Sequence, residues 1–117
     1  MSKRDHVILS KIVDEAGVIA CMIQGVDETE FLNNDEKMRA VCMTLINIGE
    51  LVKNMTDEFR SNNQHIPWKD LAGLRDVTAH GYFTLRMPDI WIYAAIELPE
   101  HATQIKALLA QVADSIE

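Results

Sequence analysis

The amino-acid sequence predicts an all-α protein, an antiparallel bundle of four to five helices in one domain that spans residues 1–117. Apolar residues recur at steps of three and four along most of the chain, and no segment has the alternation of a strand. Only three Pro and five Gly interrupt these patterns. A composition of 48% apolar and 25% charged residues is typical of a folded domain with a single core.

The first helix is predicted over residues 7–23, because its apolar residues form one amphipathic stripe. The stripe consists of Ile8, Ile12, Ala16, Ile19 and Ile23. Gly25 and Asp27 are expected to end this helix. Residues 27–34 then form a connecting turn or a short helical stub.

The second helix has the most regular pattern in the chain and is predicted to run without a break. Asn34 or Asp35 caps its start, and Asn62 and Asn63 end it. Its apolar positions alternate steps of three and four: Met38, Val41, Leu45, Ile48, Val52, Met55 and Phe59. A stripe of this regularity is typical of a core or of a dimer interface.

A third helix is expected from Pro67 to near Gly81, since proline fits the first turn of a helix. Pro88 and Asp89 begin the last helix, which is expected to kink or restart at Pro99. Its apolar stripe is Trp91, Ala95, Leu98, Ala102, Ile105, Leu109, Val112 and Ile116. Trp68 and Trp91 are expected to pack in the core or a dimer interface.

The net charge of −7 disfavours a general nucleic-acid coat, because non-specific binding depends on basic residues that neutralise phosphates. It leaves room for a local basic cleft. Lys69, Arg75 and Arg86 lie close together in sequence, and twofold symmetry would double this cluster if two copies met there.

The chain is expected to be cytoplasmic and not to contact membranes. It has no apolar run near the roughly 18 residues that span a bilayer, and no secretory signal at its start. Cys21 and Cys42 have no metal-binding spacing and are expected to be buried, reduced thiols. No metal site and no cofactor are predicted.

Four polar residues fall close together in residues 73–83, GLRDVTAHGYF: Arg75, Asp76, His80 and Tyr82. On an ideal α-helix Arg75 aligns with Tyr82, and Asp76 shares a face with His80. The two pairs then point about 140° apart, at about 100° per residue. Only the reach of Arg75, or a helix that ends at Gly81, would bring Arg75 and His80 to one phosphate.

These residue types suit metal-independent RNA cleavage through the ribose 2′-hydroxyl. His80 can move a proton near neutral pH, and Asp76 can orient it from one turn earlier. Arg75 offers a charged donor fork that matches a phosphate. From spacing alone, however, a polar helix end is the commoner interpretation, with His80 near the helix C-terminus.

The wider sequence resembles the HepT-like proteins of the HEPN superfamily, the toxin half of HEPN/MNT toxin–antitoxin pairs. The likeness lies in IPWKDLAGLRDVTAHGYF, in LINIGELVKNM and in ELPEHATQIKALL, and extends over nearly the whole chain. The family motif is Arg, four residues, His, one residue and Tyr. Arg75, His80 and Tyr82 match it, with the polar Asp76 after the arginine.

The resemblance implies a homodimer in which both motifs line one cleft, and a metal-independent endoribonuclease that acts as the toxin of a type VII system. Arg75 and His80 would be catalytic and Asp76 supporting. The partner would be an MNT-type nucleotidyltransferase that neutralises the toxin by transferring AMP to Tyr82. Lys69 and Arg86 are candidate contacts for the RNA substrate.

Two other interpretations remain open. The chain could be a noncatalytic subunit that presents a substrate or nucleotide to a partner nucleotidyltransferase, with the Arg75 and His80 region binding phosphate. The motif could also be a purely structural polar cluster at an interface.

Overall fold

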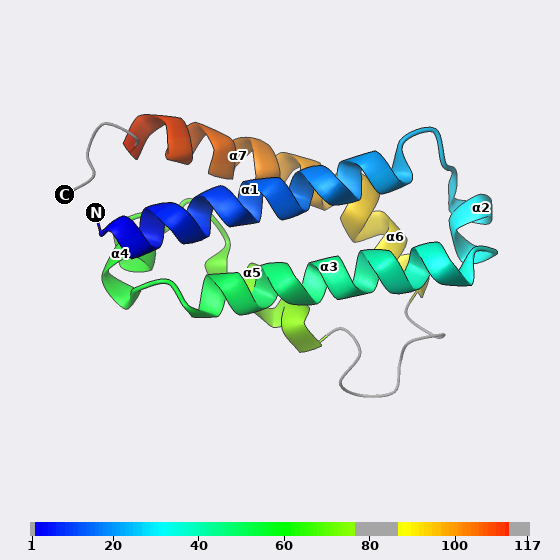
Figure 1. Cartoon of the computed structure of the whole chain (residues 1–117), viewed down its shortest axis with the longest axis horizontal. Coiled ribbons are helices and arrows are strands. Elements are labelled where there is room, and N and C mark those ends of the chain that lie inside the picture. Colours follow the sequence, from blue (N-terminus) through cyan, green and yellow to red (C-terminus); the bar gives the residue numbers. More distant parts are fainter. Residues whose placement is uncertain (1, 77–86, 113–117) are drawn as a thin grey trace.

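The computed structural model describes residues 2–76 and 87–112, and these residues are all-α with no strand, as the sequence predicts. Three long helices form the body of the bundle: α1 (Lys3–Ile23), α3 (Asp35–Lys53) and α7 (Leu98–Val112). In Figure 1, α1 lies between α3 and α7 and runs antiparallel to both, and α1 packs against each of them.

Shorter elements connect and flank these helices. The stub α2 (Glu28–Leu32) joins α1 to α3 and also contacts α6. On another side of α3 lie α5 (Trp68–Ala72) and the 3₁₀ turn η1 (Gly73–Asp76). The remaining elements are α4 (Asp57–Ser61), α6 (Met87–Ile92) and the π-helical segment η2 (Tyr93–Glu97), which leads directly into α7.

The predicted apolar stripes of α1 and α3 form the core. Ile8, Ile12, Ala16 and Ile19 are buried on α1, as are Val41, Leu45, Ile48 and Val52 on α3. Gly25, with φ 73°, reverses the chain after α1, which explains why the helix ends where the sequence predicts. Lys37 Nζ donates a hydrogen bond to the Met22 carbonyl at 2.7 Å and so binds the C-terminal end of α1 to α3.

The prediction of one unbroken helix from Asn34 to Asn62 is wrong at residues 54–56. The N-cap Asn34 is confirmed, since its side chain accepts a hydrogen bond from the Lys37 backbone N–H. However, α3 ends at Lys53, and Thr56 caps a new helix by accepting from the Phe59 N–H at 3.2 Å. Met55 and Phe59 remain buried across this break, so the apolar spacing did not reveal it.

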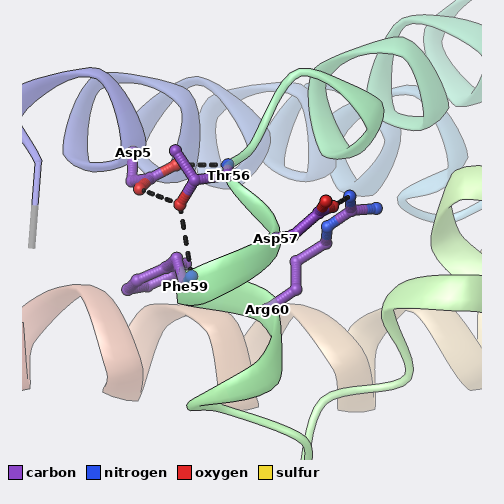
Figure 2. A network of polar contacts seen from close by, with 5 residues as sticks. All are labelled: Asp5, Thr56, Asp57, Phe59 and Arg60. Carbon is purple, nitrogen blue, oxygen red and sulfur yellow. Dashed lines mark hydrogen bonds and ion pairs between the residues drawn. The ribbon is translucent and has the colours of Figure 1, made fainter.

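A buried carboxylate fixes the chain at this break. Asp5 of α1 is 2% exposed and accepts hydrogen bonds from the Thr56 N–H at 2.9 Å and the Thr56 hydroxyl at 2.7 Å (Figure 2). The Ser2 hydroxyl donates a third bond to it at 2.9 Å. Burial raises the pKa of Asp5, but these hydrogen bonds outweigh it and hold the pKa below the ordinary value.

Replacing Asp5 by Asn is expected to lower the free energy of unfolding by about 2 kcal/mol, because hydrogen bonds to a buried charge are lost. Because the pKa of Asp5 is lowered by folding, its ionised carboxylate stabilises the fold at pH values above the ordinary carboxyl pKa of about 3.9. This stabilisation is lost as the pH falls through the pKa that Asp5 has in the folded protein. Denaturant unfolding between pH 2 and 7 should therefore show that the free energy of unfolding decreases less with falling pH in Asp5→Asn than in the wild type. The exposed Asp14→Asn on the same helix is the control; equal slopes in all three proteins would contradict this role.

The C-terminal helix departs from its predicted register before Pro99. In η2 the Leu98 N–H donates to the Tyr93 carbonyl, five residues earlier, instead of four. This wider turn places Pro99 at the start of α7, where its missing N–H breaks no α-helical bond. Before Leu98, Ile90 and Ala94 are buried in place of the predicted Trp91 and Ala95, which are only partly buried. Leu98 and Ile105 are buried as predicted.

The two tryptophans pack as predicted, but one thiol does not. Trp68 is buried, with its Nε1–H donating to the Asn63 carbonyl at 2.9 Å, and Trp91 contacts the buried ring of Phe31. Cys42 is buried, whereas Cys21 is exposed because it lies on the outer face of α1. No helix within the described ranges is long and apolar enough to span a membrane.

Candidate active site around Arg75

Of the two predicted catalytic residues, Arg75 and His80, the structure describes Arg75. It lies in the 3₁₀ turn η1. The prediction of continuous α-helix through this position is wrong, because the helix tightens at Gly73 after one turn of α5. The angles of an ideal α-helix therefore do not apply to Arg75 and Asp76. His80, Tyr82 and Arg86 lie outside the described residues, so their predicted roles stay predictions.

Residues of the core hold the turn before Arg75 in place. Trp68 and Leu71 of α5 are buried, and the rings of Trp68 and Phe59 lie with their centroids 6.2 Å apart. Lys69, the candidate RNA contact, is exposed on the same short helix. The α5 segment thus presents Lys69 to solvent while its apolar residues anchor the chain that carries Arg75.

Gly49 of α3 allows η1 to lie directly on that helix. A Cβ atom at Gly49 would lie 2.4 Å from the Arg75 backbone nitrogen, 3.0 Å from the Arg75 Cβ and 3.1 Å from the Ala72 carbonyl oxygen. Real Cβ atoms do not approach backbone atoms at 2.4 Å, so the contact requires glycine. The position of the Arg75 backbone therefore depends on one residue of α3.

Two carboxylates flank the Arg75 guanidinium. Its Nη1 lies 3.7 Å from Glu50 Oε1 on α3, and its Nε lies 3.7 Å from Asp76 Oδ1. Both distances are those of ion pairs rather than hydrogen bonds. Among the described residues the guanidinium donors form no hydrogen bond, and the side chain is 39% exposed, so it can reach an anion from solvent.

Asp76 therefore contacts Arg75 in the described part of the chain. The prediction gave Asp76 the role of orienting His80, which no described contact tests. Sequence reasoning missed Gly49 and Glu50. The available signal was a glycine in the interior of the predicted helix, directly after Ile48 of the apolar stripe. Glycine there costs about 1 kcal/mol relative to alanine, so its presence suggests a packing reason.

Other reactive groups of the described residues do not assemble a second centre of this kind. No three His, Cys, Asp or Glu residues among them are arranged to hold a metal ion. Burial raises the pKa of the Cys42 thiol to about 11, which leaves it a poor nucleophile. The Tyr93 hydroxyl and His101 Nδ1 lie 3.0 Å apart, and burial raises the Tyr93 pKa, so this pair is a structural link between η2 and α7.

Comparison with known proteins identifies the family. The model of a family described as "Ribonuclease HepT-like" matches residues 12–108, which include α3, α5, η1 and most of α7. The chain belongs to the ribonuclease HepT-like family. The fold and the superfamily that the sequence resemblance implied, HEPN, are thereby confirmed.

Individual relatives of this HepT-like chain cover nearly its full length. A protein of Caldanaerobacter subterraneus subsp. tengcongensis, named a "putative RNase", is 35% identical over 107 residues, which are 92% of this chain and 96% of that one. A "putative RNase" of Methanocaldococcus jannaschii is 33% identical over 113 residues, 96% of this chain and 93% of that one.

A more distant relative carries the family name itself. The "probable ribonuclease HepT" of Thermococcus cleftensis is 29% identical over 98 residues, 83% of this chain and 89% of that one. No solved structure gives a significant match. Because these relatives are named as ribonucleases, they support a ribonuclease activity for this HepT-like chain.

Proposed function

We propose that this HepT-like chain is a metal-independent endoribonuclease in which Arg75 binds the scissile phosphate and His80 transfers the proton. The observation that carries the proposal is the position of Arg75, which lies partly exposed on a turn packed against α3, in a chain that belongs to a ribonuclease family. Its backbone is fixed against Gly49, and its guanidinium is flanked by carboxylates at ion-pair distance. A fixed cation with available donors can stabilise the charge that develops on a phosphate during cleavage.

The proposed reaction uses the RNA itself as the nucleophile. His80 removes the proton of the ribose 2′-hydroxyl, and the 2′-oxygen forms a bond to the adjacent phosphorus while the bond from phosphorus to the 5′-oxygen of the next nucleotide breaks. The departing 5′-oxygen takes up a proton from water and leaves as a hydroxyl. Arg75 stabilises the extra negative charge on the phosphate oxygens. The mechanism uses His80 for proton transfer and Arg75 as the cation. Because DNA lacks the 2′-hydroxyl, the mechanism predicts cleavage of RNA but not of DNA.

The proposed assembly is a homodimer in which two copies of the motif line one cleft. A single chain of net charge −7 offers few cations to RNA, and Lys69, Arg75 and Arg86 would be doubled by a twofold axis. Lys69 is exposed on α5, six positions before Arg75, and would contact the RNA backbone.

The proposed regulator is an MNT-type nucleotidyltransferase acting as the antitoxin of a toxin–antitoxin pair. In this scheme the Tyr82 phenol oxygen attacks the α-phosphorus of ATP, a new P–O bond forms, and pyrophosphate leaves. The added AMP carries a negative charge close in sequence to Arg75. It would compete with the RNA phosphate for the guanidinium and so suppress cleavage.

Co-expression with an MNT-type nucleotidyltransferase is expected to add AMP to the peptide that contains Tyr82, because the Tyr82 phenol is the proposed acceptor. Mass spectrometry of that peptide measures the addition. Tyr82→Phe should stay unmodified and should still arrest growth in the presence of the partner. Tyr93→Phe is the matched control and should be modified as the wild type is; AMP on Tyr82→Phe in equal amount would contradict the scheme.

The noncatalytic alternative has one observation in its favour. The net charge of −7 and the acids Glu50 and Asp76 beside Arg75 suit a small anionic ligand better than a long RNA. A chain of this kind would bind a nucleotide, show no RNA cleavage and cause no growth arrest when expressed alone. Calorimetry with ATP and AMP, together with the cleavage assay below, separates the two functions.

A further inference from the structure

We propose that Glu50 is a positioning residue for Arg75, acting from α3 on a guanidinium that η1 carries. This inference rests on the proposed ribonuclease function and adds to it a residue outside the Arg–His–Tyr motif. It starts from the contact between Glu50 Oε1 and Arg75 Nη1 at 3.7 Å.

The backbone contact makes Glu50 a suitable partner. Gly49 sets the distance between α3 and η1, since its missing Cβ leaves room for the Arg75 nitrogen. Glu50 is the next residue on the same helix, so the element that fixes the Arg75 backbone also presents a carboxylate to its side chain. An arginine on an exposed turn otherwise samples many rotamers, and an ion pair restricts them.

The second carboxylate cannot do the same work. Asp76 follows Arg75 in the same 3₁₀ turn, so it moves with Arg75 and ties the guanidinium only to its own segment. Glu50 belongs to α3, whose neighbouring residues Ile48 and Gly49 lie in the core of the bundle. Among the contacts of the described residues, only that of Glu50 therefore relates the guanidinium to the rigid part of the fold.

The length of the contact fits positioning rather than sequestration. At 3.7 Å the Glu50 carboxylate attracts the guanidinium without taking a hydrogen-bond donor. The donors remain available for a phosphate, while the charge of Glu50 limits where the guanidinium lies. Glu50 also lines an open hollow of about 450 Å³ between α1 and α3, whose lining includes Lys11 and Leu51, so its own side chain remains accessible to water.

Glu50→Gln tests this role, because glutamine keeps the shape of the side chain and removes its charge. We expect the single-turnover rate at saturating RNA to fall about 10-fold, with the half-saturating RNA concentration changed less than about 3-fold. Glu50→Asp, which keeps the charge on a shorter side chain, should give an intermediate rate. Glu36→Gln, which removes an exposed acid at the other end of α3, should match the wild type in rate.

A second measurement follows Arg75 directly and needs no RNA. The Arg75 Nε–Hε resonance, assigned by its loss in Arg75→Lys, should shift and exchange faster with water in Glu50→Gln and stay unchanged in Glu36→Gln. An unchanged resonance and rate in Glu50→Gln would overturn the proposal. A shifted resonance with an unchanged rate would overturn the positioning role. If the wild-type chain cleaves no RNA, the proposed function fails, and the resonance alone still shows whether Glu50 holds Arg75.

Discussion

Gly49→Ala is expected to reduce RNA cleavage by about 100-fold, because a displacement of about 1 Å at a catalytic group has effects of this size. The new methyl group would meet the Arg75 nitrogen at 2.4 Å, so η1 must move away from α3 and take Arg75 with it. Overpacking should also lower the free energy of unfolding by about 1–3 kcal/mol, partly offset by the higher helix propensity of alanine. Single-turnover cleavage and denaturant unfolding measure the two effects.

Gly17→Ala is the matched control for this substitution. Gly17 lies in the middle of α1, it is exposed, and no atom lies within 4 Å of its added Cβ. Alanine there should raise the free energy of unfolding by up to about 1 kcal/mol and leave cleavage unchanged. Equal cleavage by Gly49→Ala and Gly17→Ala would show that the close approach of η1 to α3 does not position Arg75 for its proposed role in cleavage.

Arg75→Ala is expected to lower the rate of cleavage by about 1000-fold, as removal of a charge-stabilising donor does in other enzymes. Arg75→Lys should recover only a small part of that loss, because a lysine lacks the planar donor fork. The fold should change little, since both ion pairs of Arg75 are solvent-exposed and such pairs contribute little to stability. The rate at saturating RNA and the circular dichroism melt give both quantities.

Lys69→Ala separates phosphate chemistry from general attraction to RNA. As an exposed cation in a proposed backbone contact, Lys69 should affect RNA affinity and reduce the salt slope of binding by about one, with little effect on the saturated rate. A loss of saturated rate in Lys69→Ala as large as in Arg75→Ala would mean that Arg75 acts only through net charge.

The helical bundle could be predicted from the sequence because each long helix buries one face, and the residues of that face are apolar and recur at steps of three and four. Ile12, Ile19, Leu45 and Ile48 are at most 1% exposed and occur at the predicted helical steps. Periodicity did not reveal the break after Lys53, since Met55 and Phe59 continue the apolar spacing on both sides of it. The cap residue Thr56, followed by two acids, was the local signal that this pattern concealed.

The surroundings of Arg75 were harder to predict than Arg75 itself. The family resemblance made Arg75 and Asp76 site candidates, but the sequence analysis assumed an α-helix where the chain forms a 3₁₀ turn. The contacts of Arg75 with Gly49 and Glu50 join segments more than twenty positions apart, and such pairs leave no periodic pattern in a single sequence. In the same way, the π-helical turn before Pro99 moved the buried face of the last helix by a residue.

The most direct test of the proposed mechanism is a cleavage assay in excess EDTA with a defined RNA oligonucleotide and a matched oligonucleotide carrying a 2′-deoxyribose at the mapped cut site. We expect the wild-type protein to cleave the first and not the second, and to leave a 2′,3′-cyclic phosphate end. His80→Ala should cleave neither substrate at a measurable rate. Cleavage that requires Mg²⁺, cleavage of the deoxy-substituted oligonucleotide, or full activity of His80→Ala would contradict the mechanism.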